Sequence, residues 1–311
     1  MLEKLRFGIF FPQILPIPQM IEQCQFVETL GYDSLWIGDQ FYNPLRLGDP
    51  MWEAWTLLAA IATQTSRIRL GTLVTNFIYR NPALVASQAL TVDHLSAGRL
   101  ELGLGAGFSP KDHSMTGSEP WKPRERIQRF GEAVQIIDRM LRNEVTTFEG
   151  QYYRIKDAIM SPRPVQNPRP PLTLGVTGPR AMRIAAAYAD CWNTLDISVA
   201  EYSAGKRILA LKALEACRTQ QETFDEYCVS LGRCPRDIRR SLLVGYAADA
   251  PTSSLDEIKD YVCRYHEIGI SEFIFFWIPD EYREIFANRI SGFDRAMVER
   301  VAAQSLPAWR K

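Results

Sequence analysis

Residues 67–108 read RIRLGTLVTNFIYRNPALVASQALTVDHLSAGRLELGLGAGF, and this stretch predicts a strand, a helix and a second strand. Residues 68–74 are mostly apolar and β-branched, as expected of a parallel strand that is buried on both faces. A helix is expected from Pro82, because proline at the first helical position needs no amide partner, to a stop at Ser96-Ala97-Gly98. Residues 99–104 form the second strand. Both strands therefore lead into loops at one edge of a sheet, where α/β folds bind ligands.

The order of strand, loop and helix repeats along the rest of the chain. Further strands are expected at residues 6–12, 34–38, 172–176, 191–195, 238–246 and 272–277. Helical patterns follow at residues 19–30, 52–62, 124–141, 179–189, 201–231 (with breaks), 254–268 and 281–303. Eight such units predict an α/β fold of the (β/α)8 TIM-barrel type, with a doubly wound open sheet as the alternative. A barrel would place the functional residues on the loops that follow its strands.

Three features interrupt this repeat after the fourth strand. Residues 109–123 have the composition of a long polar loop, and residues 145–160 alternate around Glu149-Gly150 as in a β-hairpin. A proline-rich connector follows and is expected to be extended. We therefore expect one TIM-barrel domain, residues 1–311, with an insertion segment at about residues 109–171.

The composition argues against several classes of partner. The balance of 36 basic and 36 acidic residues provides no field that favours nucleic acid or an anionic membrane. The six cysteines include no C-x-x-C pair, and we expect them to be reduced and structural. The apolar run in MLEKLRFGIFFPQ is too short to span a membrane and lacks a leader cleavage site. These observations predict a soluble, cytoplasmic protein.

The glycines at Gly103, Gly105 and Gly107 do not have the G-x-G-x-x-G spacing of a dinucleotide-binding turn, so we reject a Rossmann interpretation. Gly105 and Gly107 fall at the predicted barrel mouth, where glycine lets a flat ligand approach the backbone closely. The alternative is that these glycines only relieve crowding in the strand.

Residues 174–180, LGVTGPR, form the clearest candidate for an anion site. A strand ends here, and a helix that begins at Pro179 would present unpaired amides and a favourable dipole to a phosphate. Arg180 would add a charge-assisted contact, with Thr177 and Gly178 beside it. The alternative is an ordinary strand-to-helix turn with a solvated arginine.

Few side chains offer acid–base chemistry at the mouth. Of the three histidines, His113 lies in the loop after strand four and is either a mouth residue or a solvated loop residue, whereas His94 and His266 are expected to be structural. Asp39 ends strand two and is either a mouth residue or a cap. Asp39 and Asp112 are also the visible carboxylates for a hydrolase or lyase. The sequence has no metal-ligand spacing and no G-x-S-x-G elbow, so we expect no metal centre and disfavour a hydrolase.

Several motifs in residues 6–195 occur together in one known family. They are GYDSLWIGD at residues 31–39, WEAWTL at 52–57, LGTLV at 70–74, YRNPA at 79–83, LSAGR at 95–99, GLGAG at 103–107 and GPR at 178–180. With these motifs the chain resembles the luciferase-like flavin-dependent oxidoreductases. That family includes bacterial luciferase, alkanesulfonate monooxygenases and deazaflavin-dependent dehydrogenases and reductases.

The resemblance implies a barrel whose loops after strands two to four hold an isoalloxazine-like ring, with a non-prolyl cis peptide at Leu73-Val74 behind the ring. The implied cofactor-binding residues are Asp39, Leu73, Val74, Thr75, Asn76, Gly105, Ala106, Gly107, Thr177, Gly178, Pro179 and Arg180, the last three at the phosphate. The expected substrate pocket contains Phe11, Gln13, Phe108 and Trp277. By analogy we expect a small-molecule substrate, a homodimer and a separate flavin or deazaflavin reductase.

Two positions depart from the family pattern. Gln40 stands where many relatives have histidine, and glutamine cannot act as a general base at neutral pH. Phe108 stands where some deazaflavin dehydrogenases have glutamate. Oxidation of sugar phosphates or alcohols is therefore not expected, and an apolar substrate fits better. Asp39, Gln40 and His113 are the candidate catalytic residues.

The leading hypothesis is a luciferase-like oxidoreductase that transfers a hydride between a reduced 5-deazaflavin coenzyme, F420, and a small apolar substrate. F420 is slightly favoured because the Tyr-Arg-Asn-Pro-Ala and Gly-Pro loops look like those of deazaflavin relatives. The alternatives are an FMN-dependent monooxygenase that receives FMNH2 from a partner reductase, and a non-catalytic flavin-binding barrel.

Overall fold

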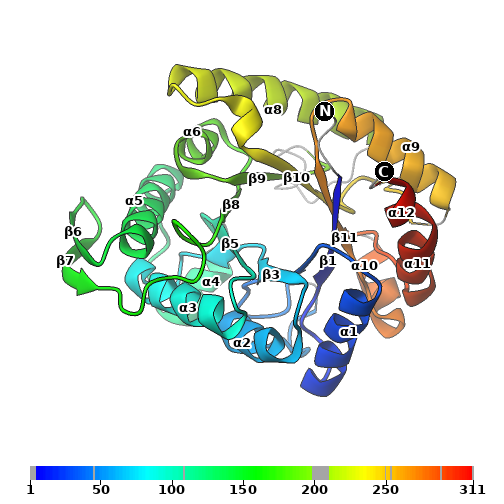
Figure 1. Cartoon of the computed structure of the whole chain (residues 1–311), viewed down its shortest axis with the longest axis horizontal. Coiled ribbons are helices and arrows are strands. Elements are labelled where there is room, and N and C mark those ends of the chain that lie inside the picture. The colour runs from blue at the N-terminus through cyan, green and yellow to red at the C-terminus, as the bar shows by residue number, and fades with distance from the viewer. Residues whose placement is uncertain are drawn as a thin grey trace.

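The computed structural model describes residues 5–44, 46–107, 109–197, 210–248, 250–252, 254–287 and 289–309. Its main-sheet strands are β1 (Arg6–Phe11), β2 (Ser34–Ile37), β3 (Arg69–Thr72), β4 (Thr75–Asn76), β5 (Leu100–Gly105), β8 (Leu172–Gly175), β9 (Cys191–Leu195), β10 (Arg239–Val244) and β11 (Glu272–Phe276). They lie in the order β3-β2-β1-β11-β10-β9-β8-β5-β4, and a further pairing of β3 with β5 closes the ring. Because β4 continues β3 after a short interruption, these strands occupy the eight positions of a TIM barrel, as predicted (Figure 1). Closure excludes the open-sheet alternative.

Helices surround the barrel, and apart from α8, whose predicted start lies outside the described residues, each begins at or near a predicted position. They are α1 (Ile17–Thr29), α2 (Ala54–Gln64), α3 (Pro82–Leu95), α5 (Pro123–Arg142), α6 (Pro179–Tyr188), α8 (Ala210–Ser230) and α9 (Leu255–His266), with a 3-10 turn, η1 (Pro235–Asp237), before β10. Local caps decide where they start: the Glu53 carboxylate accepts the amides of Trp55 and Thr56, and the Asn81 side chain accepts the amide of Ala83. The first part of the predicted 201–231 helix lies outside the described residues.

The prediction of one helix over residues 281–303 is wrong. The chain instead forms η2 (Asp280–Tyr282), α10 (Arg283–Ala287), α11 (Arg295–Arg300), a π-helical turn η3 (Val301–Ser305) and α12 (Leu306–Trp309). Between α10 and α11 the chain returns to the barrel, where Phe293 forms a β-bridge with Trp277. Glycine at 292 permits this approach, because a Cβ there would lie 2.7 Å from the Ile278 side chain.

The predicted hairpin is present, as β6 (Val145–Glu149) paired antiparallel with β7 (Arg154–Ile159). The Glu132 carboxylate on α5 accepts the backbone amides of Gln151, Tyr152 and Tyr153, at 2.8, 2.9 and 3.0 Å, and so fixes the hairpin turn to α5. Within the predicted insertion, residues 109–171, α5 packs against α3 and α6 as one of the helices around the barrel.

The expected polar loop at 109–123 contains a helix, α4 (Pro110–Thr116), which the sequence analysis missed. The Ser109 side chain caps its start by accepting the Lys111 amide, and Gly117 ends it in the left-handed conformation.

Charged side chains fill the lower end of the barrel. Glu101 pairs with Arg69 and Arg239, both at 2.6 Å, and with Arg6 at 3.3 Å, while Glu272 pairs with Arg239 at 2.8 Å. Burial opposes ionisation of Glu101, but the charges of Arg239, Arg69 and Arg6 together lower its pKa to about 2. This end of the barrel is therefore closed by an ion-pair network.

The indole of Trp36 fills the middle of the barrel above that network and is fully buried. Glycines on neighbouring strands make room for it, since a Cβ on Gly71 would lie 2.8 Å from the indole and one on Gly8 3.1 Å from its Nε1. In the part of the chain that the structure describes, no helix combines the length and apolarity needed to cross a membrane.

Candidate active site

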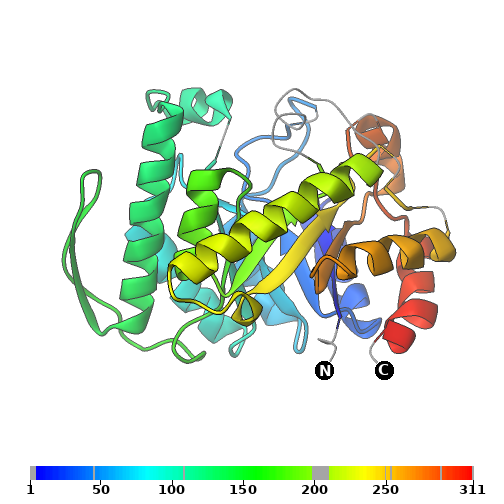
Figure 2. The ribbon, with the colours of Figure 1, turned by 90° about the horizontal axis from the view of Figure 1, so that it is seen from above.

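The loops after β2, β4 and β5 meet at the carboxyl end of the barrel, which is at the top of Figure 2 together with α4. The predicted site residues in this region are Asp39 and Gln40 after β2, residues 73–76 at β4, and residues 105–107 and His113 after β5. Their contacts show which of them act together.

Asp39 is the centre of a buried hydrogen-bond network. Its Oδ2 accepts from Arg80 Nε at 2.5 Å and from the Asn76 amide at 3.0 Å, and its Oδ1 accepts from Arg80 Nη2 at 2.7 Å. Arg80 also pairs with Glu53, and the Tyr79 hydroxyl donates to the Asp39 carbonyl at 2.7 Å. The side chains of Asp39 and Arg80 are only 2% and 9% exposed. Both carboxylate oxygens of Asp39 are therefore engaged in joining the loops after β2 and β4.

The peptide bond Leu73-Val74 is cis, at the position that the family resemblance implied. It interrupts the strand between β3 and β4, where the Thr72 hydroxyl bonds the Thr75 hydroxyl at 2.7 Å and the Gly103 carbonyl at 2.9 Å. The Val74 side chain lies against the glycines of two neighbouring strands: a Cβ on Gly105 would collide with it, and one on Gly175 would lie 2.6 Å away. The space that we assigned to a flat ligand over Gly105 is thus occupied by Val74.

Asn76 links this bulge to the loop after β5. Its Nδ2 donates to Asp112 Oδ2 at 2.8 Å, and its Oδ1 accepts the Ile78 amide at 3.0 Å. Gly107, at a φ of 68°, fits against the same residues, because a Cβ there would lie 2.7 Å from Ile78 Cδ1. Ala106, between the glycines, is partly buried and packs against the core.

Asp112, rather than His113, faces this network. Burial raises the pKa of Asp112, the Asn76 hydrogen bond opposes this change, and the negative charge of Asp39 adds to it. The adjacent His113 turns away: its Nδ1 bonds the Ser118 hydroxyl at 3.0 Å, and its ring packs edge-on against Trp121. Burial, and then the charge of Arg126, lower the pKa of His113. Consecutive residues of a helix point about 100° apart, so once α4 forms only one of the two side chains can face Asn76.

Phe11 and Trp277, which we expected in the substrate pocket, lie outside the barrel wall. Their ring centroids are 5.4 Å apart, and Trp277 packs at 6.0 Å against Phe26 of α1. Side chains alternate between the two sides of a strand, so the neighbouring Phe10 and Phe276 face the lumen instead, with centroids 4.8 Å apart. The register prediction was therefore one residue out.

Gln13 is fully buried and ties the loop after β1 to the end of β2. Its side-chain Nε2 donates to the Gly38 carbonyl, and its Oε1 accepts the Gly38 amide at 3.2 Å. Gln40 is half-buried beside Asp39. Phe108, the other residue expected in the substrate pocket, lies outside the described residues.

An apolar cluster lines the upper barrel above Trp36. It consists of Phe10, Ile14, Trp36, Leu73, Leu243, Ile274, Phe276, Ile278 and Phe286, with Val74, Leu195 and Tyr246 packed partly buried against it. Leu73 and Val74 of the cis peptide thus belong to the cluster. The cluster is an apolar core directly below the loops that carry Asp39, Asn76 and Asp112.

The start of α6 has the features of an anion site. Gly178 is the N-cap residue, and no side chain caps the helix. A Cβ at Gly178 would meet nothing within 4 Å, so the space on that side of the residue is open. Arg180 is exposed and forms no ion pair with another described residue. An uncapped helix start beside an exposed arginine could hold a phosphate, so the anion site at residues 177–180 stays a prediction.

Among the described residues, no group of three or more His, Cys, Asp or Glu side chains could hold a metal ion. The cysteines described are all free thiols.

Comparison with known proteins identifies the family. Residues 5–230 match the luciferase-like monooxygenases. This chain belongs to that family. The sequence-based recognition of a luciferase-like oxidoreductase family is therefore confirmed.

Relatives in this luciferase-like family include both monooxygenases and F420-dependent enzymes. The chain is 28% identical over 277 residues to 4-hydroxyprotoasukamycin monooxygenase of Streptomyces nodosus subsp. asukaensis, covering 85% of this chain and 70% of that protein. It is 35% identical over 164 residues to F420-dependent glucose-6-phosphate dehydrogenase of Kineococcus radiotolerans, covering 52% and 48%. The match thus spans about half the length of that dehydrogenase.

Solved structures of luciferase-like fold superimpose on nearly the whole chain. An F420-dependent secondary alcohol dehydrogenase in complex with an F420-acetone adduct has a TM-score of 0.72 at 20% identity, covering 99% of this chain and 100% of that one. The coenzyme F420-dependent tetrahydromethanopterin reductase from Methanopyrus kandleri has a TM-score of 0.73 at 15% identity, covering 98% and 99%. At these identities the likeness establishes the shared fold.

Proposed function

We propose that this luciferase-like protein is an oxidoreductase that transfers a hydride between reduced coenzyme F420 and a small apolar substrate. The observation that carries the proposal is the bulge at Leu73-Val74, which presents two apolar side chains at the top of an apolar upper barrel. The F420-dependent relatives, aligned over about half of this chain, favour the deazaflavin over FMN.

Each group of residues would have a defined task. Leu73 and Val74 would support the ring, with Thr75, Asn76, Ala106 and Gly107 forming the adjoining wall. The amides at Thr177, Gly178 and the start of α6, next to Pro179 and Arg180, would hold the phosphate. When bound, the coenzyme supplies the hydride, and the protein contributes position and electrostatics.

Asp39 would act by position rather than by proton transfer, because Arg80 and the Asn76 amide engage both of its oxygens. Asp112 is a better candidate to hold a proton, because burial favours its neutral form. Gln40 would donate a hydrogen bond to the substrate. His113 stays a candidate only if the Ser118 contact opens.

Titration of the purified protein with F420 and with FMN tests the proposal. We expect F420 to bind more tightly, and no substrate-dependent oxygen uptake. Arg180→Ala should weaken F420 binding by about 1 kcal/mol, because this exposed arginine would contact the phosphate. The matched control is Arg183→Ala on the same helix, since the Arg183 guanidinium lies 4.6 Å from the Tyr227 ring. Tighter FMN binding with oxygen uptake would contradict the proposal.

The second candidate is an FMN-dependent monooxygenase that receives FMNH2 from a separate reductase. It is favoured by the monooxygenase relative, whose alignment covers 85% of this chain. The apolar upper barrel would serve this chemistry as well, so oxygen consumption in the presence of reduced FMN decides between the two. We also propose that the protein is cytoplasmic and forms a homodimer. Light scattering of the purified protein would test the dimer.

A further inference from the structure

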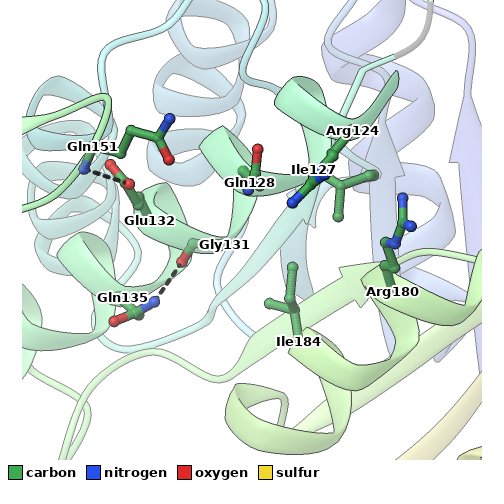
Figure 3. Close-up of a pocket in the computed structure, with 9 residues that line it drawn as sticks. All are labelled: Arg124, Ile127, Gln128, Gly131, Glu132, Gln135, Gln151, Arg180 and Ile184. Carbon is green, nitrogen blue, oxygen red and sulfur yellow. Dashed lines mark hydrogen bonds between the residues drawn. The ribbon is translucent and has the colours of Figure 1, made fainter. Parts of the chain in front are cut away.

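A groove lies on the outside of the barrel, between α5 and α6, and the proposed chemistry at the mouth does not use it. It has a volume of about 550 Å³. Its lining includes Arg124, Gln128 and Gln135 of α5, Arg180 and Ile184 of α6, and Gln151 of the hairpin turn (Figure 3).

The groove runs along one face of α5. Residues 124, 128 and 135 are spaced by four and seven positions, which places them on the same side of a helix. At 1.5 Å per residue, the eleven steps from Arg124 to Gln135 cover about 16 Å. Figure 3 shows Arg124 and Arg180 at one end of this path and Gln135 and Gln151 at the other. The groove therefore begins beside the start of α6.

The lining carries positive charge that the described protein does not neutralise. Arg124 and Arg180 form no ion pair with another described residue, whereas Arg129 and Arg142 on the same α5 pair with Glu125 and Asp138. Glu132 also lines the groove, but its two oxygens accept the three amides of the hairpin turn. The remaining polar lining consists largely of glutamine carboxamides, which can donate to carboxylates.

We propose that this groove binds an anionic, carboxylate-bearing chain that continues from the phosphate of the bound coenzyme. The inference rests on the proposed function, because Arg180 is shared by the groove and by the proposed phosphate site. Deazaflavin coenzymes continue past the phosphate into an oligoglutamate chain, whereas FMN ends at the phosphate. Guanidinium groups recognise carboxylates through paired hydrogen bonds, and a path of about 16 Å accommodates several extended residues. The groove is thus a specificity site that favours F420 over FMN.

Equilibrium titration of the full-length protein with two ligands tests this proposal. The first is F420 with its oligoglutamate chain, and the second is the same deazaflavin ending at its phosphate. For the unchanged protein we expect the tailed form to bind roughly tenfold more tightly, and this preference to shrink as salt is raised. Arg124→Glu should weaken binding of the tailed form about fivefold and change that of the tail-free form less than twofold.

Two further variants sharpen the test. Gln128→Glu places a negative charge inside the groove while keeping an acceptor for the Tyr152 hydroxyl, and it should also lower affinity for the tailed form alone. Lys122→Glu makes the same change of charge as Arg124→Glu just before α5 but outside the groove lining, and it should leave both affinities within twofold.

Equal binding of the two forms by the unchanged protein would overturn the groove proposal and leave the proposed coenzyme standing. Equal loss of both forms in Arg124→Glu would do the same. Failure of both forms to bind the unchanged protein would overturn the proposed coenzyme, and the groove proposal with it.

Discussion

Arg80 holds the mouth of the barrel together at the scale of single residues. It joins Asp39 after β2 and Glu53 before α2, and its guanidinium lies 5.5 Å from the centre of the Tyr79 ring. Its side chain is almost buried, so if the guanidinium were removed, water could not easily take its place beside Asp39. Removing the cation would leave the Asp39 carboxylate buried with only the Asn76 amide as a remaining donor among these contacts.

We therefore predict that Arg80→Met lowers the free energy of unfolding by about 3 kcal/mol, because a buried carboxylate loses its counter-ion. Urea unfolding of the purified protein measures this. In the double variant with Asp39→Asn much of the loss should be recovered, since the uncompensated charge is gone. A double variant as unstable as the sum of the single changes would show that the pair does not interact as described.

Asp112 provides a pH-dependent prediction. Its folded-state pKa is raised, so it destabilises the fold increasingly as pH rises through that pKa, whereas an asparagine does not ionise. Asp112→Asn should therefore gain stability relative to the unchanged protein between pH 4 and pH 8. The titratable groups that interact electrostatically with Asp112 are Asp39 and Tyr79. A stability difference that stays constant across this range would refute the raised pKa.

For single residues, the sequence predicts which side chains lie near the barrel mouth better than it predicts which way they point. The helix start at Gly178-Pro179 was predicted from its position after a strand, and the structure has it there, whereas the role of Arg180 stays a prediction. Phe11 and Trp277 were placed wrongly because a strand pattern that is apolar on both faces does not reveal which side faces the lumen. Asp112 was noticed only as a carboxylate, since its contact with Asn76 depends on the unpredicted helix α4.

At the scale of secondary-structure elements, the bulge between β3 and β4 depends on Gly105 of β5. Gly105→Ala should destabilise the protein by about 1–3 kcal/mol, because the added Cβ would collide with Val74. Adding Val74→Ala should restore part of this loss by removing the colliding methyl groups. Thermal unfolding of the single and double variants measures both effects.

Gly178→Ala is the control for this pair, because a Cβ at Gly178 meets no atom within 4 Å. Its effect should be no more than about 1 kcal/mol, the loss of a favoured N-cap residue without any steric clash. If Gly105→Ala were equally harmless, the close packing of Val74 on β5 would be wrong.

Elements with a strong hydrophobic periodicity and a clear turn or cap residue at their end could be predicted from the sequence. The eight strand positions and the hairpin agree with the sequence patterns. Helix α4 was missed because seven residues, about two turns, are too few to show helical periodicity. The signals for it are the caps at Ser109 and Gly117. The last helix was over-extended because the return of Phe293 to Trp277 is a tertiary contact that local pattern does not contain.

For the whole molecule, the network around Glu101 joins strands that are distant in sequence. Because the arginines lower the pKa of Glu101 from 4.5 to about 2, its contribution to stability is fully present above pH 4.5 and disappears as pH falls toward 2. Glu101→Gln should therefore cost about 3 kcal/mol at pH 7 and progressively less at lower pH. Urea unfolding at several pH values checks this, and a pH-independent cost would contradict the ion-pair explanation.

The fold as a whole could be predicted because each strand–helix unit repeats a local pattern, and eight repeats favour closure. The site could be predicted only in part, because its contacts run between loops that are adjacent in space but not in sequence. The link from Asp39 through Asn76 to Asp112 is an example. Family resemblance supplied the cis peptide at Leu73-Val74, which no local pattern would have indicated.

The ion pairs at the base of the barrel and Trp36 above them determine how a ligand can reach the inside of the barrel. With the lumen filled from Glu101 up to the indole, the barrel offers no passage from one end to the other. A ligand that approaches Phe10 and Phe276 must therefore enter and leave at the carboxyl end of the barrel. If a coenzyme and a substrate both bind at this end, as proposed, they share one entrance, and the molecule that binds first and deepest leaves last.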